Sequence, residues 1–369
     1  MKDVPVISGN RADLLNDGRE AYPAMLAAIA GARERILLEM YIFAEDNTGN
    51  AFRRALEERA RAGVPVYVIY DSVGSLGTSH GFFASLEAAG VQLRAYHPLA
   101  PWKPHWNWLF RDHRKLLLAD RAAFMGGMNL SDENAPREVG GRGWRDTHVR
   151  LDGPCVAELE TLFWTTWARI GGAVPAALRE LDLPPAGDTA VRLVSSTGLF
   201  NLHSIRLSYV HAIDRAKESI RITNAYFLPG RSIYRRLVQA ARRGVRVQIL
   251  LPYETDHPYV RWASRALFGT FLENGVELYE YQPAVLHAKT AVIDGDWSTV
   301  GTHNLDHRSL RFNLEVNVTV FGRDFGRTLE QAFEKDIAVS ARLDLKTWKQ
   351  RPLFRRLAEE SLYLVRYAL

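Results

Sequence analysis

The chain has 369 residues but only one cysteine, Cys155. A single thiol excludes an intramolecular disulfide framework and any zinc site built from several cysteines, and it is compatible with a reducing compartment. Long apolar runs are missing as well, because uncharged stretches such as residues 21–32 are far shorter than the roughly 20 residues of a membrane-spanning helix. The N-terminal residues lack the apolar core of a signal peptide. We therefore expect a protein that does not cross a bilayer.

Low-complexity tracts are also absent. With 47% apolar and 24% charged residues, the chain has the composition of a globular protein, and its length suffices for two hydrophobic cores. The formal charge of +5 is concentrated at one end, since residues 342–369 contain seven Lys or Arg and three Asp or Glu. A basic surface favours an acidic partner such as nucleic acid or an anionic membrane.

The chain repeats itself. The segments RILLEMYIF, FRRALEERARAG and VPVYVIYD are typical of strand, helix and strand over residues 35–71, and SIRITNAYF, IYRRLVQAARRG and VRVQILLP repeat that order over residues 219–252. A stretch rich in Pro, Gly and Ala at residues 171–188 separates the copies, which predicts domains at 1–175 and 186–369. Right-handed βαβ crossovers need parallel strands covered by helices, so each domain should be an α/β/α sandwich.

Both halves contain the pattern H-x-K-x-x-x-x-D, and two matches at the same place of two repeats are far rarer than one chance match. The candidate catalytic residues are His113, Lys115 and Asp120 in the first copy, and His287, Lys289 and Asp294 in the second. Residues i and i+2 of a strand share a face, so each lysine should point the same way as its histidine.

The motif aspartates should lie at hairpin turns, about 23 Å along the strand from their histidines. The returning strands end at Asn129 and Asn304, which brings these amides back to the level of the histidines. We interpret Asp120 and Asp294 as structural members of the motif that tie the turn, and Asn129 and Asn304 as phosphate-binding residues.

A histidine that acts as nucleophile or acid needs a partner on its other ring nitrogen, usually a carboxylate. Asp146 opens the strand DTHVRL, and Glu315 opens the comparable strand EVNVTV. We expect Asp146 to orient His113 and Glu315 to orient His287. Ser309 is a supporting residue that should brace the loop after Asn304.

Pairing the two halves about a pseudo-twofold axis would bring two His, two Lys and two Asn to one cleft at their interface. That set suits phosphodiester chemistry, in which one His attacks phosphorus, the other protonates the leaving alkoxide, and Lys and Asn hold the nonbridging oxygens. This chemistry requires neither a metal nor a cofactor.

The paired motifs, with GGMN and GTHNLDHRS after them, resemble the catalytic motifs of the phospholipase D superfamily over nearly the whole chain. Within this superfamily, the chain is similar to bacterial cardiolipin synthases in the segments FRDHRKLLLAD, WRDTHVRLDGP, ITNAYFLPG and NLEVNV. Because it shows no membrane helices, it most resembles the cardiolipin synthase B branch, which has none. The resemblance implies two phospholipase D-like domains that transfer a phosphatidyl group from one phospholipid to the glycerol hydroxyl of phosphatidylglycerol. It implies a phosphohistidine on His113, with His287 as acid and base.

If water were the acceptor, the same site would make a phospholipase D-type phosphodiesterase that hydrolyses phospholipid or, as a weaker alternative, nucleic acid. Two intact motifs in one chain argue against a nuclease and against a noncatalytic binding module. We therefore expect anionic phospholipids and a membrane surface as partners, with no nucleic acid, and a peripheral location on the cytoplasmic face of a bacterial cell membrane.

Two further segments invite a membrane interpretation. Residues 98–110, PLAPWKPHWNWLF, carry three tryptophans that suit either a packed core or a membrane interface. The basic tail after residue 345 interleaves leucine and aromatic residues with arginine. It could be a terminal helix packed on the second half, but its concentrated charge favours an amphipathic helix lying on anionic lipid.

Overall fold

The computed structural model describes residues 4–98, 109–176, 181–196 and 204–366. It divides into two compact units, the first made of Met1–Leu193 with Asn313–Glu315 and the second of Val194–Phe312 with Val316–Leu369. The break between Leu193 and Val194 falls a few residues after the linker predicted at 171–188. Most of the tryptophan-rich segment predicted at 98–110 lies outside the described residues.

The first unit contains one mixed sheet, with strand order β9-β1-β8-β7-β6-β2-β3-β4. The strands of this unit are β1 (Ile7–Asn16), β2 (Ile36–Met40), β3 (Val66–Asp71), β4 (Gln92–Tyr96), β5 (Arg111–Asp112), β6 (Lys115–Ala119), β7 (Ala122–Gly126), β8 (Thr147–Asp152) and β9 (Thr189–Ser196), of which β5 lies outside that order and pairs with β15. The strands β2, β3 and β4 are parallel, as the βαβ pattern predicted. The motif hairpin β6–β7 adds to β2 in antiparallel orientation.

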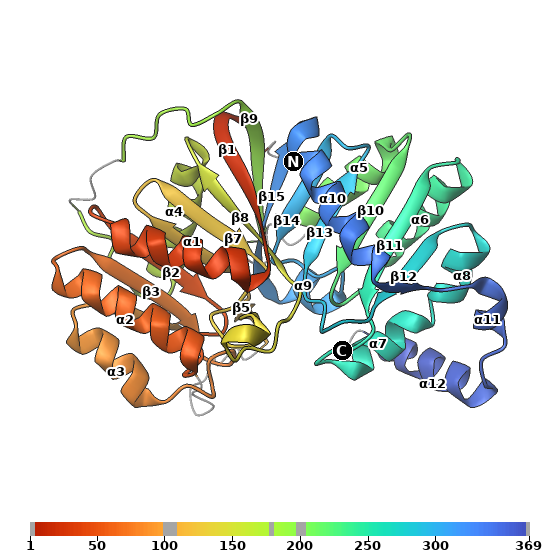
Figure 1. Cartoon of the computed structure of the whole chain (residues 1–369), viewed down its shortest axis with the longest axis horizontal. Coiled ribbons are helices and arrows are strands. Elements are labelled where there is room, and N and C mark those ends of the chain that lie inside the picture. The colour runs from red at the N-terminus through yellow and green to blue at the C-terminus, as the bar shows by residue number, and fades with distance from the viewer. Residues whose placement is uncertain (1–3, 99–108, 177–180, 197–203, 367–369) are drawn as a thin grey trace. The chain divides into compact units, whose positions relative to one another are not determined.

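Helices cover both faces of this sheet (Figure 1). The helices are α1 (Asp17–Gly31), α2 (Asn47–Arg61), α3 (His80–Ala88) and α4 (Cys155–Arg169), with a short 3-10 helix at Arg137–Val139. Helices α1, α2 and α3 share one core with alternate residues of β2, β3 and β6. Tyr67 of β3 points the other way, where its ring packs against Trp164 and Trp167 of α4. Alternation along the strands thus produces the predicted α/β/α sandwich.

The second unit repeats this plan with strand order β16-β12-β11-β10-β13-β14-β15. Its strands are β10 (Ser219–Asn224), β11 (Arg246–Pro252), β12 (Glu277–Tyr281), β13 (Lys289–Ile293), β14 (Trp297–Gly301), β15 (Asn313–Phe321) and β16 (Ser340–Arg342). Its helices are α5 (Ser204–Arg215), α6 (Arg231–Arg242), α7 (Pro258–Arg265), α8 (Phe268–Glu273), α9 (His307–Arg311), α10 (Arg323–Ala338), α11 (Leu345–Lys349) and α12 (Leu353–Leu364). Helices α5, α6 and α8 share one core, while α10 packs on the other face as α4 does in the first unit. The predicted duplication is confirmed.

The local sequence explains the matching crossover helices α2 and α6. Each buries one apolar stripe, which includes Phe52 and Leu56 in α2 and Ile233 and Leu237 in α6, while its arginines face outward. A glycine with positive φ follows each helix, at 87° and 92°, and lets the chain turn directly into the next parallel strand.

The C-terminal tail folds onto the second unit. Trp348 of α11 is buried in the core that α5, α6 and α8 share, and α12 packs beside α7. Part of the tail is therefore packed on the second unit, which is the first of the two alternatives that the sequence left open. No helix in the described ranges is both long and apolar enough to span a membrane.

Candidate active site

His113 lies between β5 and β6 with its imidazole against a carboxylate. Its Nδ1 is 3.1 Å from both carboxylate oxygens of Glu315. Glu315 is fully buried, and the amide of Asn313 donates to its Oε1 at 3.3 Å. Because an ionised carboxylate only accepts hydrogen bonds, the ring hydrogen belongs on Nδ1 and the lone pair of the neutral ring on Nε2. Nε2 is therefore the nitrogen that can attack an electrophile.

This contact corrects the predicted pairing of carboxylates with histidines. Glu315 was assigned to His287 and Asp146 to His113, whereas the structure pairs Glu315 with His113, so the assignment was wrong. The cause is the path of β15, whose first residues pair in parallel with β5. The backbone N–H of His113 also donates to the carbonyl of Leu314 at 3.0 Å. Spacing along one repeat carries no information about such long-range pairing.

Asp146 lies just before β8 and is fully buried. Its Oδ1 accepts the backbone N–H of Thr147 at 2.7 Å. A side chain at Gly127 would collide with this carboxylate, since a Cβ there would lie 2.1 Å from Oδ1. Strands β8 and β15 hold equivalent places in the two sheets, so Asp146 is the counterpart of Glu315.

His148 and Asn317, each two residues beyond these carboxylates, play the same structural role, since each accepts a backbone N–H of the loop after the motif hairpin. Nδ1 of His148 accepts the backbone N–H of Met128 at 3.3 Å, and Oδ1 of Asn317 accepts that of His303 at 3.2 Å. Burial lowers the pKa of His148 to about 4, so the ring stays neutral and can accept a hydrogen bond. His148 is thus a structural histidine.

Each motif lysine is buried and bonded to its own histidine. The ammonium of Lys115 donates to the carbonyl oxygen of His113 at 2.8 Å, and that of Lys289 donates to the carbonyl of His287. A buried ammonium needs such compensation for its lost hydration. Each lysine head is therefore fixed at the backbone of its own histidine.

Two tyrosines that sequence reasoning missed lie against these pairs. The ring of Tyr41 is 4.9 Å from the ring of His113 and 4.8 Å from the ammonium of Lys115. In the second unit the ring of Tyr226 lies at 5.9 Å and 6.0 Å from the corresponding groups. The available signal was a tyrosine just after the first strand of each repeat, in MYIF and AYFL.

A carboxylate breaks the symmetry of the two units. Asp256, in the loop after β11, accepts the hydroxyl of Tyr226 at 2.7 and 2.8 Å through its two oxygens. Burial opposes ionisation of Asp256, but the charge of the His287 imidazolium and the Tyr226 hydroxyl outweigh it and lower its pKa. The attraction is mutual, so Asp256 favours the protonated form of His287. Because Asp256 has no counterpart motif in the first repeat, the duplication could not reveal it.

The motif aspartates lie at the hairpin turns, where the spacing placed them. Each has a positive φ, 50° for Asp120 and 52° for Asp294. Asp120 accepts the backbone N–H groups of residues 33–35 at 2.8 to 3.0 Å, and Asp294 those of residues 217–219 at 2.8 to 2.9 Å. These contacts tie each hairpin turn to the loop just before β2 or β10, so each aspartate has a structural role.

The predicted amide and hydroxyl residues follow the motif hairpins. Asn129 accepts the backbone N–H of Ile42 at 3.2 Å through Oδ1, and Asn304 is buried at the equivalent place. Asp306 caps α9 by accepting the backbone N–H of Ser309 at 2.7 Å. Ser309 is thereby fixed in the first turn after the Asn304 loop.

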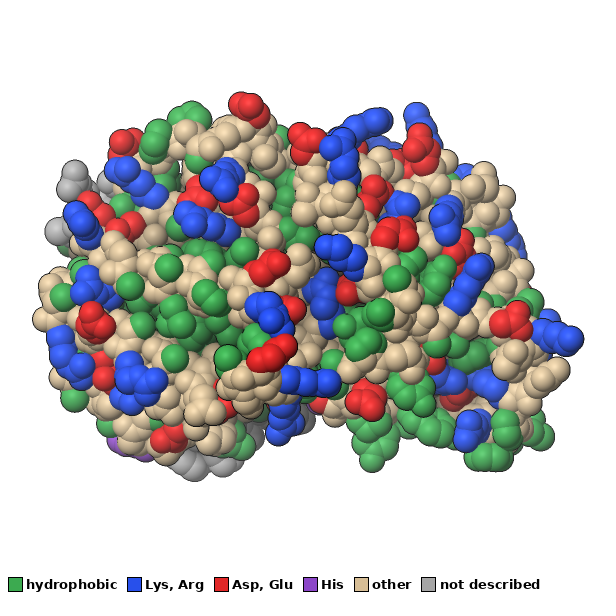
Figure 2. All heavy atoms as spheres, viewed as in Figure 1, with side chains coloured by type: hydrophobic (Ala, Val, Ile, Leu, Met, Phe, Trp, Pro, Cys, Tyr) green, Lys and Arg blue, Asp and Glu red, His purple; other side chains and the backbone are tan. Residues whose placement is uncertain are grey.

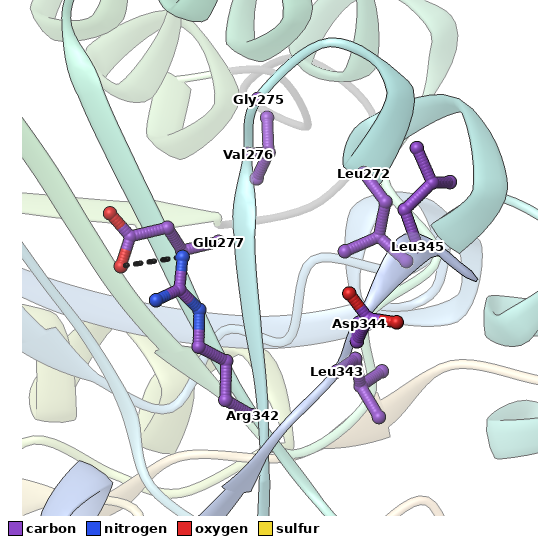
Figure 3. A pocket seen from close by; sticks show the side chains of 8 residues that line it. All are labelled: Leu272, Gly275, Val276, Glu277, Arg342, Leu343, Asp344 and Leu345. Atoms are coloured by element: carbon purple, nitrogen blue, oxygen red, sulfur yellow. Dashed lines mark ion pairs between the residues drawn. The ribbon is translucent and has the colours of Figure 1, made fainter. Parts of the chain in front are cut away.

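A pocket of about 380 Å³ lies elsewhere, beside β12 and β16 of the second unit (Figure 3). Its wall includes the ion pair between Glu277 and Arg342, with 3.9 Å between oxygen and nitrogen. None of the predicted site residues lines it. Across the described ranges, no group of three or more His, Cys, Asp or Glu side chains could hold a metal ion.

Comparison with known proteins gives the family. The family model described as "Cardiolipin synthase, PLD-like domain" matches this chain twice, at residues 25–167 and 209–337. Cardiolipin synthase 1 of Staphylococcus epidermidis is 34% identical over 358 residues, which is 95% of this chain and 73% of that protein. The major cardiolipin synthase ClsA of Bacillus subtilis is 34% identical over 356 residues, with the same coverage.

A solved structure shows the same fold at low identity. The crystal structure of phosphatidylserine synthase from Haemophilus influenzae Rd KW20 matches with a TM-score of 0.75 and 13% identity, over 97% of this chain and 95% of that one. At that identity the likeness concerns the fold alone. Both family matches contain one complete histidine–lysine motif, and the chain belongs to the cardiolipin synthase family of phospholipase D-like proteins.

Proposed function

We propose that this protein is a phosphatidyltransferase that makes cardiolipin. It transfers the phosphatidyl group of one phospholipid to the glycerol hydroxyl of phosphatidylglycerol. The observation that carries the proposal is the buried contact between Glu315 and Nδ1 of His113, which leaves Nε2 with the lone pair that a phosphohistidine mechanism needs. The synthase names of the relatives favour transfer over hydrolysis, and phospholipid over nucleic acid.

In the first half of the reaction, Nε2 of His113 attacks the phosphorus of the donor lipid. The P–N bond forms as the P–O bond to the headgroup alcohol breaks, and His287 gives its proton to the departing oxygen. In the second half, the acceptor hydroxyl loses its proton to His287 and attacks phosphorus, which breaks the P–N bond. Lys115 and Lys289 supply positive charge to the nonbridging oxygens, and Asn129 and Asn304 supply amide N–H donors.

The division of work between the histidines has a physical basis in their surroundings. A general acid must start protonated, and Asp256 supplies a negative charge that favours the protonated form of His287.

The substrates of this reaction are membrane lipids, so the protein should act at the surface of a bilayer. We propose a peripheral location on the cytoplasmic face of a bacterial membrane, with anionic phospholipids as partners. The net basic charge and its concentration in residues 342–369 support this location.

The decisive experiment uses vesicles of phosphatidylglycerol labelled in the headgroup and in the acyl chains. Purified protein should release labelled glycerol and form labelled cardiolipin. Phosphatidic acid without cardiolipin would show hydrolysis and refute the transferase. With a slow substrate, His113→Ala should abolish covalent labelling of the protein, whereas His287→Ala should still accumulate labelled protein if the leaving group is good. Labelling that survives in His113→Ala would reverse the two roles.

A further inference from the structure

The chain changes strand partners at His113. Residues 111–112 form β5, which pairs with the start of β15, whereas residues 115–119 form β6, which pairs with β2. His113 and Arg114 lie between these two strands. Buried backbone N–H groups at such a crossing need acceptors that a regular ladder does not supply. The position of His113 therefore depends on the groups that accept these hydrogen bonds.

Two buried aspartates act as acceptors at this crossing. Asp71, the last residue of β3, accepts the backbone N–H of Asp112 at 2.9 Å and the guanidinium of Arg111 at 3.4 Å. Asp112 in turn accepts the backbone N–H of Arg114 at 3.2 Å. The residues immediately before and after His113 are thus both bound to carboxylates.

The side chain of Arg114 anchors the same segment to a second layer of the unit. Its guanidinium donates to Glu39 of β2 at 3.2 Å and to the hydroxyl of Thr166 of α4 at 2.9 Å. Arg114 stands between the motif residues His113 and Lys115. It therefore ties the motif segment both to the sheet and to the helix that covers it.

Five charged side chains form this buried network, and none of them exposes more than 1% of its surface: Glu39, Asp71, Arg111, Asp112 and Arg114. Figure 2 shows, in contrast, Lys, Arg, Asp and Glu side chains spread over the visible face of the molecule, where water solvates them. Removing charges from water is costly, and a buried ion pair often adds nothing to stability. A gain in stability is thus a poor explanation for the network.

The charges of the network balance when one carboxyl group is protonated, since two arginines face three carboxyl groups. Burial raises the pKa of Asp112 well above its usual range, and the negative charge of Glu39 raises it further. Among the described residues, no donor reaches Oδ2 of Asp112 or Oε2 of Glu39. A proton on Asp112 that is shared with Glu39 satisfies both groups.

The second repeat carries no counterpart of this network. The strand registers and the distance from His287 identify the corresponding positions, which are all uncharged: Thr223, Pro252, Val285, Leu286 and Ala288. The second unit nevertheless has the same parallel strands and the same motif hairpin. The fold itself does not require the network, which serves only the repeat that holds His113.

We propose that the buried network is a positioning device for the nucleophile, and that Glu39, Asp71 and Arg114 are its positioning residues. They hold the backbone on both sides of His113, while Glu315 sets the tautomer of its ring. The proposal rests on the proposed function, in which His113 attacks phosphorus. Such an attack demands precise placement, because a displacement of about 1 Å can cost about 100-fold in rate.

The first test removes the ion pair as a pair. In the double variant Glu39→Gln with Arg114→Met, no buried charge is left without its partner, and the glutamine amide can still accept from Asp112. Melting curves should therefore show a stability close to that of the unsubstituted protein. The tether from the motif segment to β2 and α4 is lost, so His113 should be displaced.

The second test replaces Asp71 with asparagine, which keeps the size of the side chain. The carboxylate accepts the backbone N–H of Asp112 through one oxygen and those of residues 73 and 74 through the other. An amide has a single acceptor oxygen, and its NH₂ group would face one of these N–H donors. The substitution therefore releases either the segment before His113 or the turn after β3.

Glu160→Gln on α4 is the matched control. Glu160 pairs with Arg35 at 2.8 Å in the same unit, and both side chains are largely buried. Arg35 precedes β2 beside the hairpin turn of Asp120, which lies at the far end of β6 from His113. The control breaks a buried pair and leaves its arginine unpartnered by a carboxylate, so it should lower the melting temperature more than the double variant does.

The main readout is the single-turnover rate of covalent labelling by a slow substrate. In the double variant and in Asp71→Asn, this rate and kcat should fall by about 10- to 100-fold. The KM should change by less than about twofold, because the substituted residues are buried and act only through His113. The Glu160 control should label like the unsubstituted protein, although it is less stable.

A labelling rate within about twofold of that of the unsubstituted protein, in either folded variant, would overturn the proposal. So would an equal loss in Glu160→Gln, because the effect would then follow stability. Failure of both variants to fold would show that the fold requires the network, which also contradicts the proposal. The proposed function fails separately: protein that forms phosphatidic acid but no cardiolipin refutes the transferase, while its labelling rate still reports the placement of His113.

Discussion

Replacing Glu315 with glutamine tests the contact on which the proposed mechanism depends. The two side chains have nearly the same size, so the buried site stays filled. The substitution removes the negative charge that Nδ1 of His113 meets at 3.1 Å from both oxygens. A glutamine amide can still accept through its oxygen, but it can also rotate and present N–H donors, which would favour the wrong tautomer of the ring.

The size of the effect follows from the bond that is weakened. A hydrogen bond to a charged group contributes about 1.5–3 kcal/mol, more than a neutral one. Each 1.36 kcal/mol is about tenfold in rate, so kcat should fall by about 10- to 150-fold. Because Glu315 is fully buried and both of its oxygens face Nδ1, we expect a value near the upper end, about 100-fold.

The assay should follow covalent labelling in a single turnover as well as steady-state cardiolipin formation, because the contact acts on the attacking histidine. Both rates should fall together in Glu315→Gln. Glu330→Gln on α10 is the matched control, since this carboxylate pairs with Arg221 near the surface and should leave both rates unchanged. A labelling rate within about twofold of the unsubstituted protein, with the fold intact, would refute the orienting role of Glu315.

Three further substitutions test other parts of the structure. His148 is buried with its pKa lowered to about 4, so the unfolded chain takes up its proton first on acidification, and stability that is complete above pH 6.5 falls as the pH drops. Between pH 7.5 and 5.0 the loss should be about 2 kcal/mol in urea unfolding, and His148→Asn, which copies Asn317, should remove it; an unchanged slope would contradict the buried neutral ring. Asp294→Asn weakens three backbone contacts and should cost about 2 kcal/mol, lowering the melting temperature by roughly 4–8 °C, whereas full stability with lost activity would indicate a direct role in the site. Asp256→Asn should move the alkaline limb of the pH–rate profile to lower pH, because the negative charge that favours protonated His287 is removed, and an unmoved limb would deny this role.

Much of the fold could be predicted from the sequence because its signals are local. The crossover helices appear as 3.6-residue apolar stripes that end in glycine turns, and the strands appear as short apolar runs after those turns. The second repeat shows the same order of strands and helices, which supports each assignment independently. The hairpin position of Asp120 and Asp294 also followed from counting residues, since a strand has a fixed rise and a two-residue turn reverses it.

The features that the sequence missed depend on contacts between distant segments. Tyr41 and Tyr226 differ by one position in register, so comparison of the repeats did not reveal their shared place beside the motif residues. Asp256 occurs in one repeat alone. The tail was interpreted as either packed or lipid-binding, yet α12 is packed on one face and exposes leucines on the other.

By itself, the sequence determined the two α/β units, the paired histidine–lysine motifs and the structural place of the motif aspartates, because each follows from periodicity and spacing within a short segment. Only the tertiary structure decided which carboxylate orients His113. Glu315 is 202 residues away along the chain and reaches the ring because β15 begins alongside β5. No rule of spacing can assign such a partner, since the two segments meet only through strand pairing between distant parts of the chain.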